Sequence, residues 1–188
     1  VLNYFQDMTS KTLLAFIFFV SSFVQAELPE MIIGEESKSP GIDLVFEGAI
    51  KDNVFPSSKF GSEENSDIHI EVLANWNSNA PNGSPTNGFV AYLRISAEIL
   101  NQTNLETKII QLLPHLNLSD NLHYALNTKL PGSKDDLYTI TFYIDGPEDS
   151  TLGLHFDWRE EAGSYLPEVY QFIYNDLNFK EIANSSRR

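Results

Sequence analysis

The sequence predicts an all-β protein, an antiparallel immunoglobulin-like β-sandwich. Three observations support this prediction. About seven segments alternate apolar and polar residues with the two-residue period of a half-buried strand, and turn-forming residues separate them at regular intervals. No segment keeps a helical period of apolar residues, and no internal repeat is present. Strands of this number and spacing are typical of two packed antiparallel sheets.

The predicted strands follow one another with loops that are recognisable from their composition. Residues 51–65 and 77–88 are rich in Pro, Ser, Gly, Asn and acidic residues, and a polar tetrapeptide at 101–104 predicts a hairpin. Residues 152–163 mix polar and aromatic side chains without a clean period, which predicts a loop or an edge segment. The strands are expected at residues 42–50, 66–76, 89–100, 105–113, 124–130, 137–145 and 168–179.

The first part of the chain is typical of a secretory signal peptide. Residues 8–26 combine a charged start, a short apolar run and small residues before an expected cleavage after Ala26. The apolar run is short for a membrane span, which takes about 20 residues, although a retained anchor helix is the alternative. We expect an exported protein, periplasmic or secreted. Its predicted parts are residues 1–7 upstream of the true start, a signal peptide at 8–26, a flexible lead-in at 27–40, a single domain at 41–180 and a tail at 181–188.

Composition narrows the possible functions. The formal net charge is −14, so a nucleic-acid partner is not expected, because phosphate binding needs a basic surface. An acidic surface attracts cations, and it also serves solubility alone. The chain contains no cysteine, so an exported form cannot use disulfides and relies on apolar burial or a bound ion.

Histidine is the residue type that directs attention to a site. Two of the four histidines, His115 and His123, flank a turn and are expected to be anchored on strands. His69 alternates with Glu71 on a predicted strand, which places both side chains on one face roughly 6 to 7 Å apart. His155 lies two residues before Asp157. Imidazoles beside carboxylates suit a transition metal, whereas the alternative for each histidine is a solvated or structural position.

Three sequence blocks resemble the periplasmic Fe2+ transport protein family. The blocks are Ser66-Asp67-Ile68-His69-Ile70-Glu71, then Pro114-His115 leading to Ser119-Asp120-Asn121-Leu122-His123-Tyr124, then Gly153-Leu154-His155 leading to Glu161-Ala162-Gly163. The resemblance implies a secreted immunoglobulin-like homodimer that binds copper and assists iron uptake, with an inner-membrane iron permease as partner. The family's metal ligands, carried over by position, fall on His69, Glu71, His115, His123 and Asp157.

Two of these positions depart from the family pattern. His115 stands where the family has methionine, and Asp157 stands where it has histidine, for which His155 is the alternative replacement. No methionine follows Met31, so a methionine-assisted copper site is excluded from the predicted domain. The exchange of a thioether for imidazole, and of imidazole for carboxylate, shifts preference away from Cu(I). We therefore expect copper as Cu(II) or iron as Fe(II), with Mn(II) and Zn(II) as further candidates.

Other functions compete with metal binding. No hydrolase elbow, phosphate loop, zinc-protease motif or dinucleotide fingerprint is present, so an ordinary enzyme is not expected. A metal-free β-sandwich for adhesion or ligand recognition is the main alternative, with Trp76 and Trp158 as contacts. A redox enzyme that uses bound metal is a third, but the chain lacks the six histidines of copper–zinc dismutases.

Overall fold

The computed structural model describes residues 29–146, 152–163, 166 and 168–187. The predicted signal peptide and the expected cleavage after Ala26 lie outside these residues. The described chain forms eight strands and three short α-helices, and none of these helices is long and apolar enough to cross a membrane. In chain order they are β1 Glu30–Lys38, β2 Ile42–Ile50, α1 Ser57–Phe60, β3 Ile68–Trp76, β4 Arg94–Asn101, β5 Thr107–Leu116, β6 Leu122–Thr128, β7 Leu137–Asp145, α2 Phe156–Ala162, β8 Tyr170–Asn178 and α3 Lys180–Asn184.

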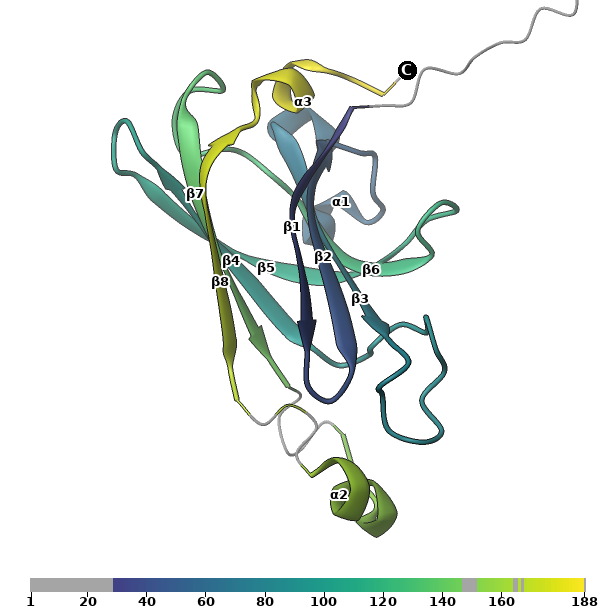
Figure 1. Cartoon of the computed structure of the whole chain (residues 1–188). Coiled ribbons are helices and arrows are strands. Elements are labelled where there is room, and N and C mark those ends of the chain that lie inside the picture. The colour runs from purple at the N-terminus through teal and green to yellow at the C-terminus, as the bar shows by residue number, and fades with distance from the viewer. Residues whose placement is uncertain (1–28, 147–151, 164–165, 167, 188) are drawn as a thin grey trace, which may run out of the picture.

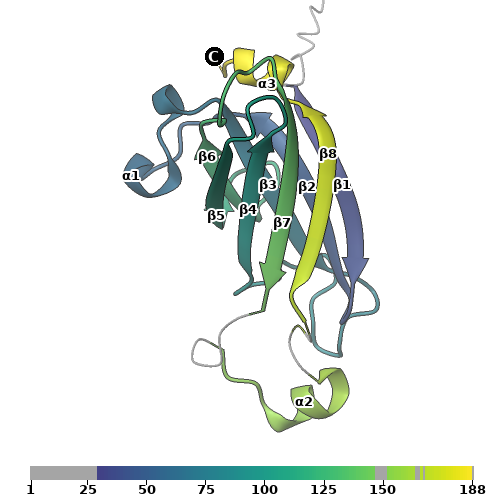
Figure 2. The ribbon, with the colours of Figure 1, turned by 90° about the vertical axis from the view of Figure 1, so that its left-hand side faces the viewer.

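The strands form an antiparallel sheet that folds over into two layers. The strand order is β1-β2-β3-β6-β5-β4-β7-β8 (Figure 1). Strand β5 joins the layers, because its first part pairs with β4 and its last four residues, Leu113 to Leu116, pair with β6. Figure 2 shows β4, β7 and β8 in front of β1, β2 and β3. The predicted all-β sandwich is confirmed.

The core fills the space between the layers with every second residue of each strand. Ile68, Ile70 and Val72 of β3 are fully buried there, as strand alternation requires. Phe46 of β2 reaches across to β7 and β8, with ring centroids 4.5 Å from Phe142 and 5.2 Å from Phe172. Apolar burial therefore holds the sandwich together without any disulfide.

The predicted flexible lead-in is wrong for most of its length, because residues 30–38 form strand β1. This edge strand pairs with β2 along its whole length, with a register shift between Ile32 and Gly34. A side chain at Gly34 would overlap the ring of Tyr174 on β8, so the two end strands of the sheet approach each other at that point. Strand β1 therefore forms because it pairs with β2 and packs against β8, and not because its apolar and polar residues alternate.

Three other boundaries differ from the sequence-based expectation. The expected tail begins with α3, whose Ile182 and Ala183 are buried against the core. Residues 156–162 form α2 instead of a loop or edge segment. The strand expected from residue 89 begins only at Arg94, because Tyr92 adopts a positive φ of 65° that interrupts extended backbone.

Candidate metal centre

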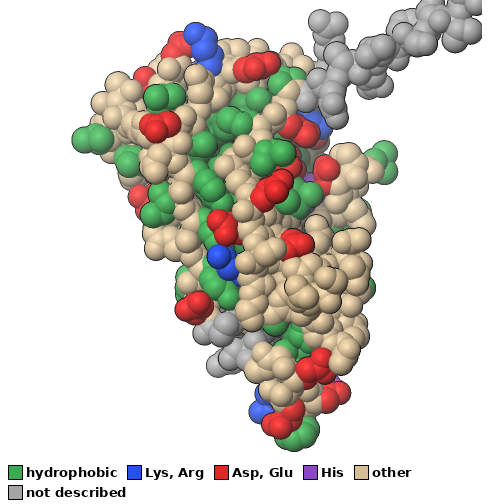
Figure 3. All heavy atoms as spheres, viewed as in Figure 1, with side chains coloured by type: hydrophobic (Ala, Val, Ile, Leu, Met, Phe, Trp, Pro, Cys, Tyr) green, Lys and Arg blue, Asp and Glu red, His purple; other side chains and the backbone are tan. Residues whose placement is uncertain are grey.

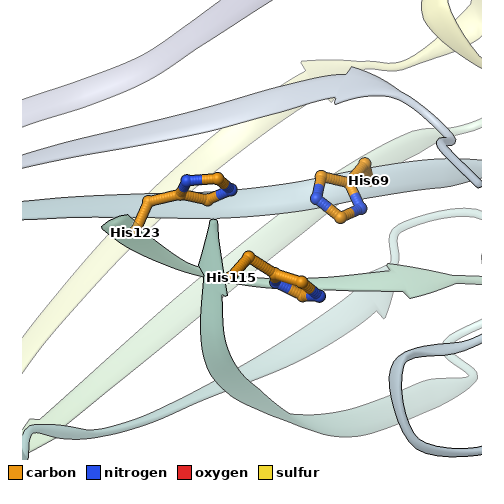
Figure 4. A group of neighbouring side chains, drawn as sticks. All are labelled: His69, His115 and His123. Atoms are coloured by element: carbon orange, nitrogen blue, oxygen red, sulfur yellow. The ribbon is translucent and has the colours of Figure 1, made fainter. Parts of the chain in front are cut away.

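Four of the predicted site residues come together on one face of the sheet. His69 and Glu71 lie on β3, His115 on β5 and His123 on β6. Because β3 alternates, His69 and Glu71 point away from the core that Ile68 and Ile70 enter. Strand β5 ends three residues later than predicted and β6 begins two residues earlier, so His115 and His123 lie within strands and are directly opposite each other in the ladder. The pairing of β3 with β6 then brings His69 beside them (Figure 4).

The three imidazoles converge closely enough to share an ion. His69, His115 and His123 each offer one ring nitrogen, and these nitrogens all lie within 4.8 Å of one another. The exposed fractions of the three residues are only 3%, 7% and 2%. Nitrogens bound to one metal lie about 3 to 4 Å apart, so small side-chain movements complete the coordination.

Glu71 lies between two of these rings. Its carboxyl oxygens are 3.7 Å from Nε2 of His69 and 3.5 Å from Nε2 of His123. These contacts are not ion pairs in the metal-free protein, because burial raises the pKa of Glu71 to about 8 and lowers the pKa of His69 to about 4. Asp120 and Glu47 add to the rise in the pKa of Glu71 by repulsion. Near neutral pH the carboxyl group is therefore protonated and the imidazole neutral.

His69 is held in a defined orientation by Asn127, a residue that no sequence motif singles out. Oδ1 of Asn127 lies 2.8 Å from Nδ1 of His69. Nδ2 of Asn127 donates to the carbonyl oxygens of Asp52 at 2.6 Å and Gly61 at 3.1 Å, which fixes the amide orientation. Nδ1 of His69 must then carry the proton, and its Nε2 keeps a free lone pair towards Glu71. Strand alternation from His123 is the one sequence signal that places Asn127 on this face.

His115 is the least satisfied member of the cluster. Both of its ring nitrogens are buried, and neither has a hydrogen-bond partner among the described residues. The ring packs against Phe60 of α1, with centroids 4.6 Å apart. Burial lowers its pKa to about 4, so the ring is neutral and has a lone pair to offer. An unpaired buried polar group costs about 1–3 kcal/mol, which a bound metal would offset.

A pocket of about 290 Å³ opens over the cluster. The loop that follows β2 covers one side of it, with Asp52, Phe55 and Phe60 in the lining, and Arg187 from the end of the chain lines another part. The pocket is large enough for an ion with water or another small ligand. On the face seen in Figure 3, acidic side chains are spread over the surface and basic ones are few, a distribution that favours cations.

His155 and Asp157 do not join this cluster within one chain. Both are exposed and line a second pocket beside Trp76, at the far end of β3 from His69. At about 3.3 Å per residue, the seven steps from His69 to Trp76 span roughly 23 Å. Helix α2 lies at the lower end of the molecule in Figure 1, away from α1.

The two tryptophans named for a recognition surface pack against each other. The ring centroids of Trp76 and Trp158 are 5.9 Å apart, and Trp76 is only 6% exposed. Trp76 is therefore a core residue with little surface to offer a partner. The burial of Trp76 therefore does not support the alternative function, a metal-free sandwich that recognises a ligand through this residue.

Comparisons with known proteins found a matching family profile, similar sequences and similar solved structures. The profile of a family described as Fe2+ transport protein matches residues 27–180. A UPF0423 protein of Brucella abortus is 23% identical over 155 residues, covering 79% of this chain and 84% of the relative.

Among solved structures, copper-reconstituted P19 of Campylobacter jejuni is 26% identical, covers 78% of this chain and 94% of its own, and has a TM-score of 0.67. FetP of uropathogenic Escherichia coli strain F11, expressed in the periplasm, is 22% identical. It covers 78% of this chain and 95% of its own with a TM-score of 0.64, a likeness that shows the fold alone.

Proposed function

Because the chain belongs to the Fe2+ transport protein family, we propose that it is an exported protein that assists Fe2+ acquisition by binding a transition metal at His69, His115, His123 and Glu71. The observation that carries this proposal is the convergence of three buried, neutral imidazoles around one pocket. Strands that are distant in the sequence hold them there. The ring nitrogens of His115 have no hydrogen-bond partner among the described residues, so they are available to a metal. We propose metal binding and delivery, not catalysis.

The donor set favours metals that accept imidazole together with carboxylate. Three imidazoles and one carboxylate fit Cu(II), Fe(II) and Zn(II), and Mn(II) less well. The copper-reconstituted relative from Campylobacter jejuni supports copper. His115 in place of a thioether makes Cu(I) the less favoured oxidation state, because imidazole is the harder ligand.

This chain's own residues prepare the pocket for the ion. Asn127 aims Nε2 of His69 inwards, and burial keeps the rings of His69 and His115 neutral. Without a bound cation, the carboxyl group of Glu71 is protonated near neutral pH, because burial raises its pKa to about 8. Binding of a divalent ion should therefore displace that proton and leave the site with one compensating negative charge.

We propose that the remaining predicted ligands act in a second copy of the chain. His155 and Asp157 are exposed at α2, and they line a pocket beside Trp76, too far from His69 to reach the cluster of their own chain. In the homodimer that we expect, α2 of one copy would supply one of them to the other copy's pocket. We place this assembly in the periplasm or outside the cell, with an inner-membrane iron permease as its partner.

Calorimetric titration of the purified protein tests the proposal. Cu(II), Zn(II), Mn(II) and, under anaerobic conditions, Fe(II) should be compared on wild type and on a variant that carries both His69→Ala and His123→Ala. We expect tight binding of at least one metal by wild type and a loss of about 100-fold or more in the double variant.

Two controls make the titration decisive. Circular dichroism should show that the double variant is folded, and Asp176→Asn, a change at an exposed residue of β8 outside the cluster, should bind as wild type does. The proposal fails if wild type binds none of the four metals, or if the double variant binds as tightly as wild type while remaining folded.

A further inference from the structure

The segment after α3 reaches the mouth of the metal pocket. Helix α3 is fixed by burial of Ile182 and Ala183, and the carbonyl oxygen of Ala183 accepts a 2.9 Å hydrogen bond from Nζ of Lys134. Its direction is therefore set by the core, and residues 185–187 continue from it. The last of these, Arg187, lines the pocket together with His69, Glu71 and His115.

Arg187 is held in place by an ion pair on the opposite side of the pocket. Its Nη1 is 3.0 Å from Oδ2 of Asp52, and the two side chains are 31% and 36% exposed. The backbone of Asp52 is in turn tied to Asn127, the residue that orients His69, through its N–H at 3.0 Å and its carbonyl oxygen at 2.6 Å. The guanidinium of Arg187 is thus linked through Asp52 to Asn127, which orients His69.

A permanent positive charge at a cation site opposes the ion that the site is built to bind. The charge of Arg187 acts on the pocket, because it lowers the pKa of both His69 and Glu71 as one of the smaller contributions. The same field disfavours a divalent cation between those residues, and it cancels part of the attraction that the Asp52 carboxylate exerts on positive charge at His69. The family profile ends at residue 180, so Arg187 lies outside the region that the profile matches.

We propose that Arg187 is an affinity-determining residue that weakens the metal site and speeds release of the bound ion. This inference rests on the proposed function, since it presupposes a metal at the histidine cluster. A site that delivers metal must let it go, and three imidazoles with a carboxylate hold transition metals tightly. The guanidinium, anchored by Asp52, supplies a repulsion that persists at every physiological pH.

Charge-matched variants test the inference. Arg187→Gln removes the charge and keeps a polar side chain, whereas Arg187→Lys keeps the charge. We expect Arg187→Gln to bind Cu(II) or Zn(II) about tenfold tighter and to release it to a chelator more slowly by a similar factor. Arg187→Lys should stay close to wild type. The difference between Arg187→Gln and wild type should shrink in about 0.5 M salt, which a purely structural effect would not do.

Lys38→Gln is the control for net charge, since Lys38 pairs with Ile42 at the end of the sheet far from His69, and its substitution makes the same change in charge away from the pocket. Its metal affinity should equal that of wild type. Equal affinity of Arg187→Gln and Arg187→Lys overturns the inference, and so does weaker binding by Arg187→Gln. If wild type and all variants bind no metal, the proposed function itself fails, an outcome distinct from binding that is insensitive to Arg187.

Discussion

Replacing Glu71 by Gln should uncouple metal binding from proton release. In the metal-free protein the pKa of Glu71 is about 8, so the carboxyl group is about 90% protonated near pH 7. A divalent ion bound between His69 and His123 needs the carboxylate, and the proton must leave. His69 and His115 contribute nothing, because their pKa values of about 4 leave both rings neutral.

The expected release is therefore close to one proton per metal near pH 7, and it falls towards zero as the pH rises above the pKa of Glu71. Metal affinity should rise close to tenfold per pH unit below about pH 8 and level off above it. In Glu71→Gln both effects should vanish, and affinity near pH 9 should be lower than in wild type because the anionic ligand is gone.

Calorimetry in several buffers with different ionisation enthalpies measures this quantity. The slope of the observed binding enthalpy against the buffer's ionisation enthalpy gives the protons released per metal. Asp176→Asn, a carboxylate change at an exposed residue of β8 outside the cluster, serves as the control and should release the same number of protons as wild type. Equal release from wild type and Glu71→Gln, or no release from wild type near pH 7, would refute the assigned role of Glu71.

The remaining predictions concern stability and the support of the site. Without metal, thermal stability should fall as pH drops below about 6.5, because histidine in the unfolded chain takes up protons at its ordinary pKa of 6.5. Folded His69 and His115 resist protonation down to about 4, and together they outweigh the opposite effect of Glu71. The contribution of Glu71 to stability should be lost as pH rises from 4.5 towards 8, because only the unfolded chain ionises Glu71 in that range. In Glu71→Gln, the decrease in stability over this pH range should therefore be smaller. Asn127→Ala should weaken metal binding about tenfold, and nitrogen NMR should show that the ring of His69 no longer keeps its proton at Nδ1; Asn127→Asp, which keeps the acceptor, should restore the tautomer. Gly34→Ala should cost about 1–3 kcal/mol in denaturant unfolding, because the added methyl group overlaps Tyr174; an unchanged midpoint would contradict the packing of β1 on β8.

Strands buried on one face could be predicted from the sequence alone. The strong alternation of residues 137–145 predicts β7 with the bounds that the structure shows, and β3 and β8 differ from prediction by only a few residues. Strand β1 was missed, because an edge strand owes its formation to hydrogen bonds with β2 and to the contact of Gly34 with Tyr174. Such partners are invisible to local periodicity.

The sequence by itself determined the residue types of the proposed metal site. Histidines on alternating strands, and the blocks around His69 and His123, indicate imidazole and carboxylate ligands before any tertiary contact is known. Their alternation also places His69 and Glu71 on the same face, since side chains on a strand repeat every two residues.

Only the tertiary structure decided which of those residues meet. The pairing of β3 with β6, which are not consecutive, and the passage of β5 between the layers bring three histidines to one point and leave His155 and Asp157 at α2. Folding also brings Asn127 beside His69 and Arg187 to the pocket, where burial raises the pKa of Glu71 and Arg187 adds a positive charge. Burial and distance between remote segments are properties of the folded chain, and no local pattern encodes them.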